Sequence, residues 1–358
     1  MFFKKSSFIF LSIILLIISF SLLPINTFTN SLIVDIDGLE DPIIANHSIV
    51  HRVRLDLVPE SVIIEAKNTL QIAYGHTSHG SQIIDGMSGL SAFKESLGGT
   101  EDLYDWNEGG IDGALDIDDY FVSGDLGNPD RTTWASLTRD YLDNPANSEV
   151  NVVMWSWCGQ VSSASVEDIE TYLNLMSDLE IDYPDIYFIY MTGHVDGGGL
   201  EGNLHLRNEQ IRNYCYTYNK ILFDFADIES YDPEGSYFGD KYVTDNCDYD
   251  SNEDGDPWND GANWAIEWQD THPGEWYDCG AAHSQSLNAN QKAYAIWWLW
   301  ARLSGWEDNS TYIYTPNPTT FTPTGFTSFI GGYISLALVL TVAFTVIVLV
   351  ERRKKFMD

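Results

Sequence analysis

The stretch Leu70–Ile84, LQIAYGHTSHGSQII, joins a short apolar run to a turn rich in Ser, His and Gly. Residues 70–74 are mostly apolar, which is typical of a buried strand, and the run breaks at Gly75. After Gly80 the apolar residues recur every three to four positions, which predicts a short helix. A strand, a turn and a helix N-terminus expose a side chain beside backbone N–H groups, so this stretch predicts a reactive loop.

Further apolar runs alternate with helical patterns along the chain. Buried strands are expected at residues 150–157, 186–192 and 221–225, and a shorter one at 103–106. Helices are expected at residues 59–68, 132–142, 165–177, 208–219 and 287–303. This alternation predicts an α/β fold with a mainly parallel sheet, whose strands all end at one edge.

Both ends of the chain carry apolar segments. Basic residues precede the apolar run 8–23, so residues 1–30 are expected to be a signal peptide, although an uncleaved anchor helix fits the same pattern. Residues 329–350 are uncharged and long enough to cross a bilayer, and the basic tail 351–358 is expected in the cytoplasm. These patterns predict a single-pass cell-membrane protein with an extracellular N-terminal domain.

The part between these segments is expected to form one domain. Residues 31–57 show little periodicity and are expected to be a surface lead-in. The domain follows over residues 58–306 and includes an Asp- and Trp-rich insertion at 231–282. A Thr- and Pro-rich stalk is expected at residues 307–328.

The composition excludes some classes of partner. The formal net charge of −35 repels nucleic acid, so no nucleic-acid partner is expected. The chain is not a disordered acidic tract, because 12 Trp, 20 Tyr and 17 Phe supply ample apolar area for a core. The four cysteines lie in the part expected outside the cell, where disulfides persist. Cys247 and Cys279 flank one loop-rich segment and are the favoured pair, which leaves Cys158 and Cys215 either paired or as buried thiols.

Polar residues follow three of the expected strands. The sequence GHTSHG follows the first, Cys158-Gly159-Gln160 the second and Gly193-His194-Val195-Asp196 the third, while His283 precedes the last helix. Ligands bind at this edge of an open α/β sheet. Nucleophilic acyl transfer uses a Ser as the nucleophile, a His as its base and amide N–H groups that stabilise the oxyanion, and residues of all three kinds are present here.

An early Ser and a His just before a terminal helix resemble the SGNH/GDSL hydrolase superfamily over roughly residues 69–304. The resemblance implies a divergent member with a flavodoxin-like, three-layer α/β/α domain, which the terminal segments would make membrane-anchored and extracellular. It implies a serine esterase, needing no cofactor for catalysis, that removes acyl or acetyl groups from a glycan or lipid. By position, it makes Ser78 the nucleophile, His283 the base, and Gln160 and Gly110 or Gly109 the oxyanion donors.

The sequence departs from the superfamily pattern at three points. The usual Gly-Asp-Ser reads His-Thr-Ser here, and Gln160 stands in place of Asn. No Asp lies three residues before His283, so Asp278, five residues before it, is the residue expected to orient the imidazole. Ser81 is the alternative nucleophile.

Two other functions fit the same residues. His76, His79, His194 and Asp196 could instead bind zinc in a metal-dependent hydrolase. Alternatively, the altered Ser motif and the missing upstream Asp fit a non-catalytic glycan-binding or adhesion module on the same fold.

The insertion contains the acidic sequence DYDSNEDGD. Its alternating oxygen ligands before a Gly match the first half of a calcium loop, but the twelfth position is Gly261 rather than Glu. The sequence therefore predicts a loose structural calcium site, with a solvated acidic loop as the alternative. The candidate ligands are Asp248, Asp250, Asn252, Asp254 and Asp256.

Overall fold

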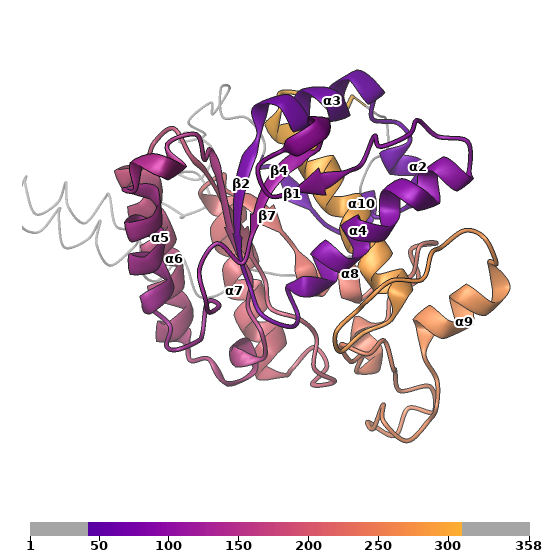
Figure 1. The fold of residues 1–358 in the computed structure, drawn as a ribbon. Coiled ribbons are helices and arrows are strands. Elements are labelled where there is room, and N and C mark those ends of the chain that lie inside the picture. The colour runs from indigo at the N-terminus through magenta and orange to yellow at the C-terminus, as the bar shows by residue number, and fades with distance from the viewer. Residues whose placement is uncertain (1–41, 310–358) are drawn as a thin grey trace, which may run out of the picture. The chain divides into compact units, whose positions relative to one another are not determined.

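The computed structural model describes residues 42–309 (Figure 1). The expected signal peptide, transmembrane helix and cytoplasmic tail, and nearly all of the expected stalk, lie outside these residues. In the described part of the chain, no helix is both long and apolar enough to cross a bilayer.

Seven parallel strands form one sheet, in the order β1-β7-β6-β5-β2-β4-β3. The strands are β1 (Ile44–Ala45), β2 (Gln71–Gly75), β3 (Trp106–Asn107), β4 (Leu115–Asp119), β5 (Val152–Trp155), β6 (Tyr187–Met191) and β7 (Ile221–Phe223). The predicted α/β fold is therefore confirmed. After β2 the chain forms β3 and β4 on one side of that strand, and it later forms β5 on the other side. The strand order therefore reverses between β2 and β5, and ligands bind in such sheets at the loops that follow the strands at this point.

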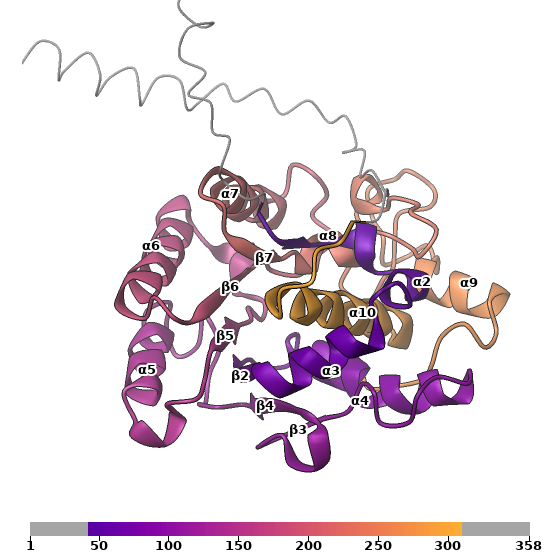
Figure 2. The same cartoon turned by 90° about the horizontal axis from the view of Figure 1, so that it is seen from above.

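Helices cover both faces of the sheet (Figure 2). One face carries α3 (Glu60–Thr69), α4 (Ser81–Ser96) and α10 (Ser286–Leu303), and the other α5 (Thr133–Leu142), α6 (Val166–Asp182) and α7 (Asn203–Thr217). The shorter helices are α2 (Arg52–Leu55), α8 (Phe225–Glu229) and α9 (Trp264–Thr271), and the 3₁₀ turns are η2 (His47–Ile49), η3 (Ile111–Gly113), η4 (Pro145–Asn147), η5 (Gln160–Ser163) and η6 (Gly239–Lys241).

The apolar runs form strands because both faces of the sheet are buried. In β2, Ile72 and Tyr74 pack on the side of α10, whereas Ala73 packs on the side of α6. Successive strand side chains point to opposite faces, so a strand covered on both sides needs apolar residues throughout. Helix α10 is buried on nearly all sides, and its second half, from Ala293 to Leu303, is accordingly almost all apolar. Its first half buries polar side chains, namely Asn288, Asn290, Gln291 and Lys292.

Three segments without a clear pattern belong to the fold. In the expected lead-in, β1 pairs with β7 and Ala45 and Leu55 are fully buried, so residues 44–55 are part of the domain. Strand β4, LDIDD, forms in a stretch for which no strand is expected, with Leu115 and Ile117 buried. The insertion 231–282 carries α9 and a small core of its own around Trp264 and Trp268.

All four cysteines are free thiols in the structure, so the predicted Cys247–Cys279 disulfide is not formed. Asn288 of α10 contacts the sulfur of Cys247, while Asn290 contacts that of Cys279. Residues two positions apart point to nearly opposite sides of a helix. The two thiols therefore lie on different sides of α10.

Candidate active site

Two glycines let the loops after β2 and β5 lie directly against each other. A Cβ on Gly75 would lie 2.3 Å from the ring of Trp155, and one on Gly80 would lie 2.3 Å from the hydroxyl of Ser156. Any larger residue would push the loops apart. The close approach brings Ser78 and His79 against Cys158.

Cys158, His79 and Asp245 form a hydrogen-bonded chain. The Sγ atom of Cys158 lies 3.2 Å from Nδ1 of His79, and Nε2 of the same ring lies 3.1 Å from Oδ2 of Asp245. Cys158 follows β5, His79 lies between β2 and α4, and Asp245 comes from the insertion. This is the geometry of a nucleophile, a base and the acid that orients the base.

The chain favours a charged thiolate and imidazolium. The hydrogen bond from His79 lowers the pKa of Cys158 to about 6, against the opposing effect of burial. Burial disfavours charge on His79 as well, but its bonds to Asp245 and Cys158 outweigh this and raise its pKa to about 9. The pKa of Asp245 is lowered: burial opposes this shift, but the bond to His79 and the nearby charges of His194 and His79 together outweigh it. At neutral pH the thiol is therefore ionised and the imidazole protonated.

Ser78 and His283 also meet, although 205 residues separate them. Nε2 of His283 lies 3.0 Å from Oγ of Ser78, and that hydroxyl lies 3.4 Å from Sγ of Cys158. The ring of His79 stacks on His283, with centroids 4.6 Å apart. The side chain of Asp278 accepts instead from the hydroxyl of Ser286, and Nδ1 of His283 bonds to no described residue. Asp278 therefore does not make the hydrogen bond expected to orient His283.

Gln160 positions the Cys158 loop instead of facing the reaction centre. Its Oε1 accepts from the backbone N–H of Cys158 at 2.9 Å, and its Nε2 donates to both oxygens of Asp125 at 3.0 and 3.2 Å. Asp125 is buried and also accepts from Thr77 Oγ1 at 2.6 Å. Asp125 thus connects the loop after β2 to the loop after β5. Since the amide of Gln160 is already engaged, it does not fit the expected role of oxyanion donor.

Backbone N–H groups fit that role better. Those of Ser78 and His79 donate to no described residue, and they precede the first turn of α4. The N-terminus of a helix favours negative charge, so these two groups are suited to stabilise an oxyanion near Cys158 and Ser78.

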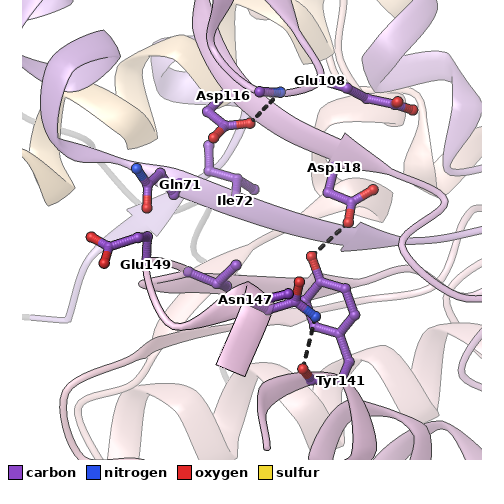
Figure 3. A pocket seen from close by; sticks show the side chains of 11 residues that line it. Gln71, Ile72, Glu108, Asp116, Asp118, Tyr141, Asn147 and Glu149 are labelled. Carbon is purple, nitrogen blue, oxygen red and sulfur yellow. Dashed lines mark hydrogen bonds between the residues drawn. The ribbon is translucent and has the colours of Figure 1, made fainter. Parts of the chain in front are cut away.

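Gly110 lies at the opposite edge of the sheet. Its neighbour Gly109 donates to Asp116 at the start of β4, beside a pocket of about 410 Å³ that Gln71, Asp118 and other residues line (Figure 3). Gln71 begins β2, whereas Ser78 follows its end, and a five-residue strand spans roughly 13 Å between its first and last residues. Neither Gly109 nor Gly110 is therefore placed to stabilise an oxyanion at Ser78.

The other residues expected at the site divide into two groups. His76 is fully buried and binds Asp119 at 2.6 Å and the carbonyl of Thr77 at 2.9 Å. Ser81 donates to the carbonyl of Ser78, and Asp196 accepts from the backbone of Gly198. These three side chains serve local structure, whereas His194 stacks on His79 with ring centroids 4.2 Å apart.

The acidic loop folds on its own carboxylates. Asp250 is buried and accepts from the backbone N–H groups of residues 253–255 at 2.7 to 3.2 Å. Asn252 accepts from Asp254, Asp254 accepts from Asp256, and Asp248 binds Asn263. Among residues 42–309, three His, Cys, Asp or Glu residues have ligand atoms within 4.8 Å of one another at one place, and that place is His79, His194 and Asp245 rather than this loop. No three of the carboxylates in this loop therefore have oxygens within 4.8 Å of one another, and calcium binding here stays a prediction.

Sequence reasoning missed Asp245 altogether and assigned no chemistry to Cys158. Cys158 was recognisable as a polar residue at a strand end, but the expected extracellular setting favoured a structural role. Asp245 lies in an irregular segment, next to the isolated pairing of Thr244 with Asp196. No local pattern marks that position.

No family model, curated protein or solved structure matches the chain. The geometry of the site therefore carries the functional argument.

Proposed function

We propose that the chain is a hydrolase that cleaves acyl esters through a covalent intermediate on Cys158. The observation that carries the proposal is the chain from Cys158 through His79 to Asp245, with contacts of 3.2 and 3.1 Å. The core strand order β4-β2-β5-β6-β7 supports a flavodoxin-like, SGNH-type domain, since it is the order 2-1-3-4-5 of that architecture.

The reaction would proceed in two balanced steps. The thiolate of Cys158 attacks the carbonyl carbon of the ester, a C–S bond forms, and the backbone N–H groups of Ser78 and His79 stabilise the oxyanion. The C–O bond then breaks, and the leaving alcohol takes the proton of His79. Neutral His79 next removes a proton from water, which hydrolyses the thioester, releases the carboxylic acid and restores the thiolate–imidazolium pair.

Ser78 is the second candidate nucleophile, because its hydroxyl lies 3.0 Å from Nε2 of His283. That pair lacks a carboxylate to orient the imidazole, whereas His79 has Asp245. Ser78 is half-buried beside Cys158 and would otherwise contact the substrate or the thiolate.

Labelling with iodoacetamide tests the nucleophile. We expect Cys158 to be alkylated first at neutral pH, because burial raises the pKa of Cys247 and Cys279 to about 12 and also raises that of Cys215. These three thiols are the internal control. Preferential alkylation of any of them would contradict the assignment.

Turnover of a small aryl ester tests the reaction. Cys158→Ala should lower kcat/KM by several orders of magnitude, because removing the nucleophile of a catalytic triad costs on the order of 10⁶ in kcat. Cys279→Ala is the matched control. A trapped acyl group should map to Cys158 and be released by hydroxylamine as a thioester. An acyl group on Ser78, with activity retained in Cys158→Ala and lost in Ser78→Ala and His283→Ala, would establish the serine mechanism instead.

The setting of the reaction is part of the proposal. The apolar segments near both ends support a membrane-anchored extracellular enzyme. The resemblance to the SGNH/GDSL superfamily supports acyl or acetyl esters of a glycan or lipid as its substrates. The competing function is a non-catalytic glycan-binding or adhesion module. A folded protein with no esterase activity and no reactive Cys158 would favour that module.

A further inference from the structure

One cluster of possible metal ligands consists of His79, His194 and Asp245, whose ligand atoms all lie within 4.8 Å of one another. Among residues 42–309, no other three His, Cys, Asp or Glu residues meet this distance. His79 is 6% exposed and His194 is 7% exposed, so both imidazoles are shielded from water. Their rings are stacked, with an interplanar angle of 14°. The proposed thiol mechanism uses His79 and Asp245 and leaves His194 without a function.

The hydrogen bonds of His194 leave one ring nitrogen available. Nδ1 lies 2.5 Å from the carbonyl of Val195, and because a carbonyl only accepts, Nδ1 must carry the hydrogen. In the neutral ring Nε2 then keeps its lone pair, and this nitrogen bonds to no described residue. The loop is held in place because the N–H of Val195 donates to buried Glu229 at 2.9 Å. An imidazole fixed through Nδ1 to a backbone carbonyl is the usual form of a metal-binding histidine.

We propose that His79, His194 and Asp245 bind a divalent transition metal, and that Zn²⁺ suits the donors best. Two imidazoles and a carboxylate, with water as the fourth ligand, are a common tetrahedral zinc set. Ligand atoms of such an ion lie roughly 3.4 Å apart, given bonds of about 2.1 Å. Side-chain shifts of about 1 Å would thus close the cluster around the ion.

Metal binding would block the thiol chemistry, a consequence that rests on the proposed function. The ion takes Nε2 of His79, the nitrogen that now contacts Asp245, so Asp245 becomes a metal ligand. With Nε2 occupied by the ion, the ring could no longer form the imidazolium that protonates the leaving alcohol in the proposed mechanism. Cys158 contacts Nδ1, which points away from Nε2, so the thiol lies outside the coordination sphere. Zinc therefore acts as an inhibitor that does not bind the nucleophile.

A direct binding measurement tests the site. Purified full-length protein is stripped with chelator and titrated with Zn²⁺ against a chromophoric zinc indicator. We expect one ion per chain. Removing a group that only orients a metal ligand weakens binding roughly 10- to 100-fold. Because His194 is proposed to be a ligand itself, His194→Ala should weaken zinc binding by more than this. The matched control is His272→Ala, which removes the histidine at the C-cap of α9, outside the cluster. Unchanged affinity in His194→Ala would overturn the inference.

The Cys158→Ala variant separates this inference from the proposed function. Zinc affinity should not fall in that variant and can rise, because His79 holds its proton less tightly without the thiolate. Co²⁺ bound to the wild type should show no thiolate-to-metal charge-transfer band. Loss of binding in Cys158→Ala would overturn the site, because the thiol would then be a ligand. Failure of the thiol mechanism would appear separately, as ester turnover that persists in Cys158→Ala while zinc still binds.

Discussion

Lys292 donates to Glu229 at 2.8 Å, and both side chains are fully buried. Lys292 also donates to Gln82, whose amide in turn donates to the carbonyl of Ala282 at 2.6 Å. The second oxygen of Glu229 accepts from the backbone of Val195 at 2.9 Å. One buried ion pair therefore connects the loops that carry His79, His194 and His283.

Removing one partner of this pair should be strongly destabilising. Lys292→Met leaves Glu229 as an uncompensated buried charge, which costs about 3–5 kcal/mol in comparable cases. Urea denaturation measures the free energy of unfolding. The double variant Lys292→Met with Glu229→Gln should recover part of the loss, because no buried charge is left alone. Equal destabilisation in the single and double variants would contradict this account.

Asp245→Asn should lower kcat/KM for an aryl ester by about 100-fold, the usual scale of acid–base contributions. The amide cannot accept from His79 with the strength of a carboxylate, so the imidazolium loses its stabilisation. Asp270→Asn, an exposed change on α9 in the same insertion, is the matched control. A similar loss in both variants would indicate a general effect on the insertion.

The pH profile of kcat/KM should be bell-shaped. As the pH falls through about 6, Cys158 takes up a proton and the nucleophile is lost, so the rate falls. As the pH rises through about 9, His79 loses the proton that the leaving group needs, so the rate falls again. Because Cys158 and His79 interact, the two pKa values that limit the profile describe the pair rather than either residue alone. In Asp245→Asn the upper limit should move to lower pH, and an unshifted limit would exclude His79 as the group responsible.

Asp250→Ala should destabilise the insertion, because the carboxylate accepts from the three backbone N–H groups of residues 253–255. Hydrogen bonds to a charged group contribute about 1.5–3 kcal/mol each, so we expect a loss of about 2–3 kcal/mol after local rearrangement. The calcium site predicted at this loop can be tested in the same thermal melts. A calcium-dependent rise in the wild-type midpoint that Asp250→Ala abolishes would support it, and a midpoint insensitive to calcium and chelator would argue against it.

The central strands could be predicted from the sequence because burial on both faces requires continuous apolar runs. Strands β2, β5 and β6 lie within or close to the expected ranges, and the helix expected at residues 287–303 is α10. Strands β1 and β4 could not be predicted in this way. The first has two residues, and the second alternates apolar residues with aspartates that read equally well as a loop.

The place of the site could also be predicted, because parallel strands end at one edge. Its chemistry was only partly predictable. The partners of Ser78 and Gln160 depend on how two loops pack, and only that packing shows that His283 reaches Ser78 while Gln160 turns to Asp125. Asp245 reaches His79 through the folding of the whole insertion, which no pattern of neighbouring residues encodes.

The close approach of the loops after β2 and β5 has a consequence for protein engineering. Each of Cys158, His79, Asp245 and His283 is supplied by a separate connection, and the spacing between two of these connections depends on glycines that tolerate no added side chain. Grafting any one loop onto another scaffold would transfer a single functional group without its partners. The transferable unit is the sheet edge together with the insertion that completes it.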